Sequence, residues 1–196
     1  MIMKTALVAL RVTVVTLVLT GLVYPLVCTA LASFLFSRQA AGSMLTDDHG
    51  VVVGSELIAQ AFVKPAYFQP RPSAAGDKGF DAAASGGSNL GTTSKKLRDR
   101  VIADVARLRT ENPDAGNVPV ELVSASGSGL DPHISVEAAR WQVARVAKAR
   151  GVGEARVASI VESGIEGRVF SVLGEPRVNV LLLNVALDRQ FGRPGG

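Results

Sequence analysis

The feature that most constrains this chain is an uninterrupted apolar run close to its N-terminus. The sequence has no charged side chain from Val12 to Phe36. As a helix, these roughly 25 residues would be about 37 Å long at ~1.5 Å per residue. A bilayer core of about 30 Å needs about 20 residues. Gly21 and Pro25 lie inside the run, and both are tolerated better in membrane helices than in soluble ones. The run therefore predicts one transmembrane helix.

A cleaved signal peptide is the competing interpretation of the same segment. Its apolar region is usually ~7–15 residues long, which is shorter than this run. Residues Ala30-Leu31-Ala32 do form an A-x-A-like cleavage site, so the alternative stays open. The length of the run favours an anchor that is retained in the mature chain.

The flanking charges predict the orientation of the anchor. Lys4 and Arg11 precede the core of the run, whereas Arg38, Asp47 and Asp48 follow it. The positive-inside rule then places the N-terminus in the cytoplasm. We expect a single-pass protein of the bacterial inner (plasma) membrane, in contact with the lipid bilayer, with an extracytoplasmic C-terminal domain.

The remaining sequence predicts one small domain of the α+β class, with mixed α/β structure, after the anchor. We expect the cytoplasmic end and transmembrane helix in residues 1–36, a polar tether in 37–50, the extracytoplasmic domain in 51–190 and a tail in 191–196. The only cysteine, Cys28, lies in the membrane run. The outer domain is therefore held by its hydrophobic core without a disulfide.

The basic pI of 9.6 invites a nucleic-acid role, which the distribution of charge opposes. Lys4 and Arg11 belong to the anchor, which leaves 19 basic residues against 17 acidic ones. Aromatic residues are only 5% of the chain, and the basic residues are scattered rather than clustered on one face. We expect no nucleic-acid partner.

Three segments have the patterns of helices. Ser94–Asn112 is amphipathic, with apolar residues at spacings of four, four and three. Ser135 is placed to cap a helix over Val136–Arg150 that ends at Gly151, and a third helix runs from about Glu154 to Ser163. We expect the apolar faces of the first two helices to form the core.

Shorter segments give weaker patterns. Val51–Val53 is an extended run, Leu57–Phe62 fits one or two helical turns, and Val120–Val123 and Arg168–Leu173 fit strands. By composition alone, residues 73–93 would be a flexible linker. Val178–Leu187 fits a strand and a helix equally well, so both remain open.

One cluster has the residue types of a hydrolase. Ser126, Ser128, Asp131 and His133 lie within one short segment. A catalytic triad needs side chains that converge from separate elements, which residues this close in sequence can seldom provide. A tight loop rich in glycine is the favoured interpretation. An anchored extracytoplasmic hydrolase that uses Ser126 or Ser128 with His133 is the alternative.

A second cluster, Ser85-Gly86-Gly87-Ser88-Asn89, could hold a phosphate with its backbone N–H groups. Such loops are more often plain turns, and nucleotides are cytoplasmic whereas this loop is expected outside. The sequence has no phosphate-binding loop of the G-x-x-x-x-G-K-[ST] type. Two histidines and one membrane cysteine cannot make an ordinary zinc site. We expect no catalytic residue, no bound metal and no firmly bound cofactor.

Several longer segments together carry a family resemblance that runs from the anchor to about Asp188. They are Gly54-Ser55-x-Leu57-Ile58-x-Gln60-x-Phe62, Pro65-x-Tyr67-Phe68-x-x-Arg71-Pro72-Ser73-Ala74, Ser85–Gly91, Ser124–Ser135, Gln142–Gly151 and Glu175–Leu181. With these segments the chain resembles the C subunits of the Kdp potassium-transporting P-type ATPases.

The resemblance implies a role inside a complex. It implies a non-catalytic subunit that stabilises an ATP-driven, high-affinity potassium importer, with a channel-like potassium-binding subunit and a P-type ATPase subunit as partners. It further implies a catalytic chaperone that raises the ATP affinity of the ATPase subunit, with the Ser85–Asn89 loop as the candidate nucleotide contact. A cover over the outer mouth of the channel subunit is the other implied role. The candidate partner contacts are Arg71, Asn89, Asp131, His133 and Asn179.

Overall fold

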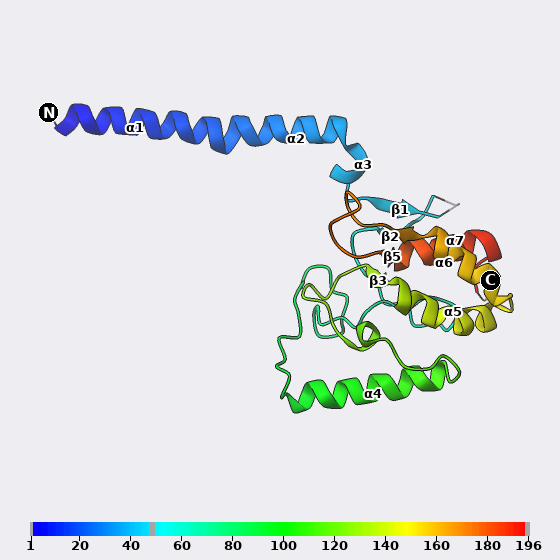
Figure 1. Cartoon of the computed structure of the whole chain (residues 1–196). Coiled ribbons are helices and arrows are strands. Elements are labelled where there is room, and N and C mark those ends of the chain that lie inside the picture. Colours follow the sequence, from blue (N-terminus) through cyan, green and yellow to red (C-terminus); the bar gives the residue numbers. More distant parts are fainter. Residues whose placement is uncertain (1, 48–49, 195–196) are drawn as a thin grey trace. The chain divides into compact units, whose positions relative to one another are not determined.

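The computed structural model describes residues 2–47 and 50–194, which fall into two compact units, Met1–Met44 and Leu45–Gly196. The expected combination of one long apolar N-terminal helix and a small mixed α/β domain is confirmed. Figure 1 shows both units.

The first unit is dominated by one continuous helix. It consists of α1 (Ile2–Val18), the π-helical turn η1 (Leu19–Val23) and α2 (Tyr24–Leu35), and α3 (Ser37–Ala40) follows. The 34 residues from Ile2 to Leu35 are long and apolar enough to cross a membrane, and none is buried by the rest of the chain. At ~1.5 Å per residue the helix is about 51 Å long, so its ends extend beyond a bilayer core of about 30 Å.

The π-helical turn has a cause in the sequence. Pro25 has no N–H to donate, and its ring collides with the carbonyl of the residue four positions earlier, which is Gly21. The wider π-turn over Leu19–Val23 ends two residues before Pro25 and contains Gly21, whose carbonyl is the one in question. Local widening of this kind lets a membrane helix continue through a proline.

The second unit contains two small sheets. Strands β1 (Met44–Thr46) and β2 (Val52–Ser55) pair with each other. Strands β3 (His133–Ser135), β4 (Ile165–Glu166) and β5 (Arg177–Asn179) form an antiparallel sheet with β5 in the centre. Ile134 and Ile165 both lie opposite Val178 in this sheet. His133 and Glu166 therefore come from the two edge strands.

Helices complete the domain. They are α4 (Lys95–Glu111), the 3-10 helix η2 (Val120–Val123), α5 (Val136–Arg150), α6 (Glu154–Ser163) and α7 (Val180–Phe191). Helix α5 packs on α6, and α6 packs on α7 (Figure 1). The alanines of α5 allow a close approach: Ala138, Ala139 and Ala147 are almost fully buried.

The predicted core is correct for α5 and only partly so for α4. Eight residues of α5 are buried, whereas Leu108 is the one buried residue of α4. Val101 and Val105 are partly buried against the core. Helix α4 therefore lies at the edge of the domain.

Three of the short predicted elements are wrong. Val120–Val123 is a 3-10 helix, since Leu122 N donates to Pro119 O at 3.0 Å, and Leu122 and Val123 are buried side by side. Leu57–Phe62 is a turn followed by chain with no helix or strand, because the Ser55 hydroxyl accepts the N–H of Leu57 and ends β2 in a turn. Arg168–Leu173 folds back on itself instead of forming a straight strand.

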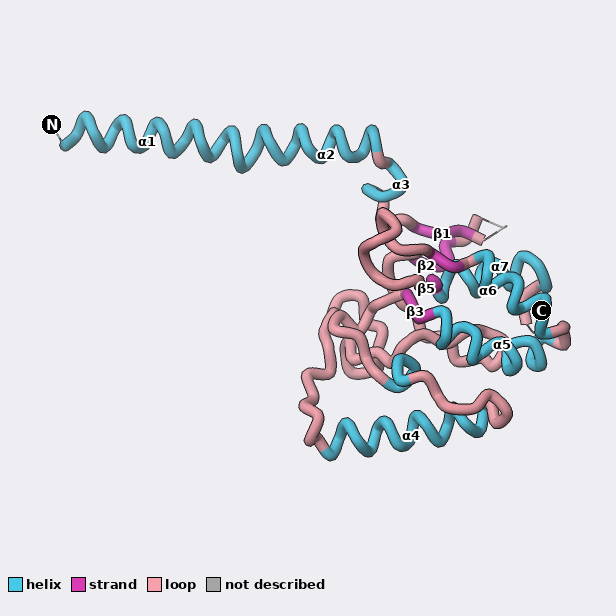
Figure 2. The backbone as a smooth tube through the Cα atoms, viewed as in Figure 1, coloured by secondary structure: helices cyan, strands magenta, loops and turns pink. Residues whose placement is uncertain are grey.

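The ambiguous segment Val178–Leu187 contains both structures. It is a strand up to Asn179 and the helix α7 from Val180 onward. The Asn179 side chain marks the change, because its Oδ1 accepts the N–H of Leu182 at 3.1 Å as a helix N-cap. Residues 73–93 have no helix or strand, as Figure 2 shows, but several hydrogen bonds tie them to other parts of the domain.

Candidate functional site

The two glycine-rich loops predicted as sites lie against each other. Gly86 N donates to Ser128 O at 2.8 Å, and the Ser85 hydroxyl donates to the same oxygen at 3.1 Å. Nearby, the Ser73 hydroxyl donates to Gly129 O at 2.6 Å and accepts the N–H of Phe80 at 2.7 Å. The segment that composition assigns to a flexible linker is therefore joined to the 126–133 loop by hydrogen bonds.

Glycine is required at two points where these loops meet. Gly129 has a φ of +67°, and a Cβ there would lie 2.6 Å from Gly86 O and 2.7 Å from Ala75 N. A Cβ on Gly87 would lie 3.0 Å from Gly127 O, although Gly87 has no positive φ. Close backbone approach is thus the common requirement, and a left-handed φ adds to it only at Gly129.

The hydrolase arrangement is not assembled in the described residues. Ser126 Oγ lies 3.4 Å from Ser128 Oγ, and Ser128 Oγ accepts the N–H of Leu130 at 3.1 Å. The ring of His133 faces carboxylates instead: its Nδ1 lies 3.5 Å from Asp131 Oδ1 and its Nε2 lies 3.4 Å from Glu166 Oε2. A serine nucleophile needs its hydroxyl within hydrogen-bond reach of the base. Among the described contacts, none joins His133 to either serine.

Arg71 connects the 124–131 segment to the domain. Its Nη1 lies 3.2 Å from Asp131 Oδ2 and 3.9 Å from Glu121 Oε1. Its other two nitrogens donate to Ser124 O and Ala125 O at 3.3 and 3.4 Å. A planar guanidinium with several fixed donors can hold a loop backbone and a carboxylate together. Arg71, predicted as a partner contact, thus has four internal partners.

Asp131 is stabilised in its ionised form. The hydrogen bond to the His133 side chain lowers the pKa of the Asp131 carboxyl, and the His133 N–H and the Arg71 charge lower it further, against the opposing effect of burial. The groups lie at a cleft of about 280 Å³, which is lined by Glu121, Asp131, His133, Ile134, Ser135, Glu175, Pro176 and Arg177. Its lining has three carboxylates, Glu121, Asp131 and Glu175, against one arginine, Arg177, so acidic groups predominate.

The other predicted contacts differ in exposure. Asn179 is 4% exposed, and its Nδ2 donates to Glu56 O at 2.7 Å in addition to its capping role. Asn89 is exposed and has a left-handed φ of 49°, which asparagine tolerates better than most residues. The Asn89 side chain is thus exposed, whereas that of Asn179 is buried and holds the start of α7.

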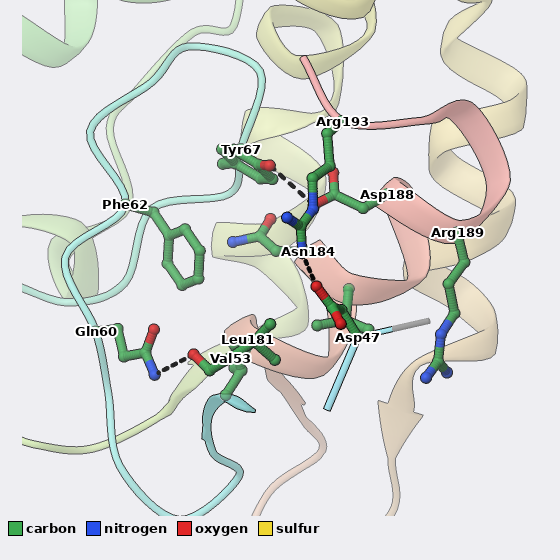
Figure 3. A pocket seen from close by; sticks show the side chains of 11 residues that line it. Asp47, Val53, Gln60, Phe62, Tyr67, Leu181, Asn184, Asp188, Arg189 and Arg193 are labelled. Atoms are coloured by element: carbon green, nitrogen blue, oxygen red, sulfur yellow. Dashed lines mark hydrogen bonds and ion pairs between the residues drawn. The ribbon is translucent and has the colours of Figure 1, made fainter. Parts of the chain in front are cut away.

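A larger pocket of about 440 Å³ lies between the 60–67 segment and α7, as Figure 3 shows. Tyr67 donates its hydroxyl hydrogen to Asp188 Oδ2 at 2.8 Å, and Arg150 Nη2 lies 2.8 Å from Asp188 Oδ1. Arg193, which Figure 3 shows beside Asp188, has its Nη2 2.7 Å from Asp47 Oδ2. Burial raises the pKa of the Tyr67 hydroxyl, and the hydrogen bond to Asp188 raises it further.

This pocket was not found from the sequence. Tyr67 and Asp188 are 121 residues apart, and no spacing pattern joins them. Each of its two carboxylates is paired with an arginine, so the pocket offers no unpaired acid for a cation. No group of three or more potential metal ligands occurs in residues 2–47 and 50–194.

Comparison with known proteins identifies the family to which these features belong. A family model described as "KdpC: K+-transporting ATPase, c chain" matches residues 6–189. The chain is 63% identical over 190 residues to a potassium-transporting ATPase KdpC subunit of Myxococcus xanthus, covering 96% of this chain and 90% of that relative. It is 55% identical over 174 residues to the KdpC subunit of Rhodospirillum rubrum, covering 88% and 89%. A KdpC subunit of Rhodopseudomonas palustris (strain BisB5) is 54% identical over 191 residues, covering 92% and 94%.

Proposed function

Because this chain belongs to the KdpC family, the c chains of K+-transporting ATPases, we propose that it stabilises an ATP-driven potassium importer as an accessory subunit without catalytic residues of its own. The observation that carries the proposal is the family match over residues 6–189, which includes both the apolar helix and the domain. The partners we propose are the channel-like potassium-binding subunit and the P-type ATPase subunit of the same complex.

The membrane arrangement is part of the proposal. We propose that the helix Ile2–Leu35 anchors the chain in the inner membrane, and the bias of Lys4 and Arg11 to its first half supports an N-terminus in the cytoplasm. The domain then lies outside, on the side of the membrane from which potassium enters.

The proposed effect on ATP affinity is indirect. The Gly86 N–H is already donated to Ser128 O, and residues 82–94 contain no lysine or arginine to balance the charge of a phosphate. An outer domain also has no access to cytoplasmic ATP. A chaperone effect on the ATPase subunit is therefore transmitted through contacts between subunits, and the same contacts allow the domain to cover the outer mouth of the channel subunit.

Affinity purification tests the assembly. The tagged full chain is co-expressed with the large subunits, and the membranes are solubilised in mild detergent. The proposal expects the channel-like and ATPase subunits to be retained with the tagged chain. Retention of neither large subunit, with the tagged chain itself recovered in the membrane fraction, would refute it.

Protease accessibility tests the orientation. Protease added to spheroplasts should digest the domain, whereas sealed inverted membrane vesicles should protect it. The reverse pattern would place the domain in the cytoplasm, and a mature N-terminus at Ser33 would show that the helix is a cleaved signal peptide.

A further inference from the structure

The connection between β4 and β5 ends in an exposed apolar tip, residues 169–173. Four of its five side chains are large and apolar, and their exposed fractions are 48% for Val169, 87% for Phe170, 72% for Val172 and 61% for Leu173. Single exposed apolar residues are ordinary, but a contiguous group of this size at one loop indicates an interaction site. Figure 2 shows the segment as a loop that leads into β5.

The backbone of the apolar tip has a fixed shape. Val169 and Leu173 exchange two hydrogen bonds, each of 2.9 Å, and Ser171 N donates to Arg168 O at 3.1 Å. Phe170 and Ser171 both have left-handed φ values, 51° and 62°. Left-handed non-glycine residues are uncommon, and they persist where surrounding bonds determine them. The backbone of the tip therefore holds residue 170 in a defined conformation, from which the exposed Phe170 side chain projects.

The charges below the apolar tip are paired within the domain. Arg168 Nη2 lies 2.7 Å from Glu175 Oε2, and Arg177 Nε lies 3.1 Å from Glu166 Oε2. Each arginine is balanced by a carboxylate, so the base of the tip has no net charge. The tip itself has no charged residue.

These observations distinguish between two possible occupants. A loop that enters a membrane surface gains binding free energy from basic residues that face anionic headgroups. At the base of this tip each basic residue is paired with an acidic one, and Glu175 is highly exposed. A fluid lipid surface also gains little from a fixed loop shape. Binding to a pocket on a protein is favoured by both the uncharged apolar tip and its fixed backbone. A loop whose backbone is already ordered loses little conformational entropy on binding.

We propose that the apolar tip inserts Phe170 into an uncharged, apolar pocket on the outer face of the channel-like subunit, whose outer mouth the domain is proposed to cover. The inference rests on the proposed function, because it needs a partner subunit. It goes further by assigning the contact to residues 169–173, which are separate from the glycine-rich loops.

Co-purification of variant chains tests the inference. The tip variant carries Phe170→Asn and Leu173→Thr; asparagine keeps the left-handed φ of position 170, and threonine suits the bridge at position 173. The matched control carries Val63→Asn and Ile102→Gln, which remove two other apolar residues that are 82% and 60% exposed. We expect the tip variant to retain at least ~10-fold less of the large subunits, as for the loss of a central anchor, and the control to behave as the unmodified chain.

Further readouts separate a lost contact from a lost fold. The tip variant should unfold thermally like the unmodified chain, and Phe170→Leu, which restores an apolar side chain, should recover most of the retention. Unchanged retention in the tip variant, or an equal loss in the control, overturns the inference while leaving the proposed function intact. If the unmodified chain itself retains no large subunit, the proposed function fails and the inference fails with it.

A lipid measurement decides the remaining alternative. The full chain with Phe170→Trp is reconstituted alone in phosphatidylcholine–phosphatidylglycerol vesicles that contain brominated acyl chains, and the signal of the buried Trp141 is subtracted with the unmodified chain. We expect no quenching of the tryptophan at position 170. Strong quenching would show that the tip enters the bilayer, which overturns the inference.

Discussion

The side-chain amide of Gln142 pairs with the backbone of Gln69 through both of its ends. Gln69 N donates to Gln142 Oε1 at 2.8 Å, and Gln142 Nε2 donates to Gln69 O at 3.1 Å. Asn184 of α7 makes the same pair of bonds with Phe68, at 2.8 and 3.0 Å. Both amides are buried, so they substitute for a neighbouring strand along a proline-rich segment that has no strand partner.

The first prediction concerns this pairing. Gln142→Met keeps the length of the side chain but leaves the part-buried N–H and C=O of Gln69 without these partners. We expect a loss of about 2–4 kcal/mol in the free energy of unfolding, measured by denaturant titration of the full chain in detergent. Gln190→Met, at an exposed position of α7, is the control and should change the free energy by less than about 0.5 kcal/mol. Equal stability of the two variants would show that the Gln142 bonds do not hold the segment.

The second prediction separates backbone strain from close contact in the glycine-rich loops. Gly129 and Gly116 both have left-handed φ values, +67° and +73°, but a Cβ at Gly116 would meet no atom within 4 Å. Gly116→Ala should therefore cost about 1 kcal/mol from strain alone. Gly129→Ala should cost about 2 kcal/mol more because the methyl group would overlap Gly86 O and Ala75 N. Similar thermal unfolding of the two variants would contradict the close approach of the loops.

The third prediction follows the burial gradient along α4. Leu108 is 2% exposed, Val105 is partly buried and Ile102 is 60% exposed. A buried, unpaired carboxylate is costly, so Leu108→Asp should destabilise the domain by several kcal/mol. Val105→Asp should cost less, and Ile102→Asp should cost almost nothing. Limited proteolysis and denaturant titration measure the order, and a protease-resistant Leu108→Asp variant would contradict the assigned face.

The sequence predicts the helices of this domain well because their signals are local. Ser135 caps α5 through a hydrogen bond from Ala138 N, and Gly151 ends the helix with a φ of +66°, as their positions in the sequence indicate. The order in residues 64–93 depends instead on distant partners: Gln142 for Gln69, and Gly129 for Ser73. Composition describes such a segment as a linker because its partners are about 55–75 residues away, and local patterns contain no information about them.

The same distinction applies to the candidate site. The proximity of Asp131 and His133 is a local property, and the sequence finds it. Glu166, the second carboxylate beside His133, comes from another strand through the pairing of β4 with β5, so it was missed. The sequence predicts a strand over Arg168–Leu173, which contains the apolar tip, because a run of Val, Phe, Val and Leu fits one and no local signal marks the turn at Phe170 and Ser171.

The fourth prediction is a pH dependence that arises from Asp131. The pKa of this carboxyl is lowered in the folded domain from its ordinary value of 3.8, so the ionised form stabilises the fold. That stabilisation is complete above the unfolded pKa and is lost as the pH falls through the lower, folded pKa. The stability difference between the unmodified chain and Asp131→Asn should therefore be constant between about pH 5 and 6 and should shrink as the pH is lowered below about 3.8. Asp114→Asn, at an exposed position, is the control. A difference that grows on acidification would show the opposite sign of the pKa shift.

The last prediction concerns ATP. Direct nucleotide contact by the Ser85–Asn89 loop would need free N–H groups and a cation in the loop, yet Gly86 N is bonded to Ser128 O and the loop itself has no basic side chain. Lys95, at the start of α4, is paired with Asp99. One N–H of the first turn of α4 is also taken, because Ser94 Oγ accepts the N–H of Leu97. We therefore expect no saturable ATP binding by the purified full chain in equilibrium dialysis, with the ATPase subunit measured in parallel as the positive control.

The competing idea of direct contact makes a different forecast for the same measurement. It requires saturable binding by the full chain that is abolished in Ser88→Ala with Asn89→Ala and kept in a control with Ser163→Ala and Asn117→Ala, which lie outside the loop. In the assembled complex, our interpretation expects the loop variant to leave the ATP affinity of the ATPase subunit unchanged. It also expects loss of the apolar tip to alter that affinity through weakened assembly. Saturable binding by the chain alone, lost only in the loop variant, would overturn the indirect role and would also require the orientation of the domain to be measured again.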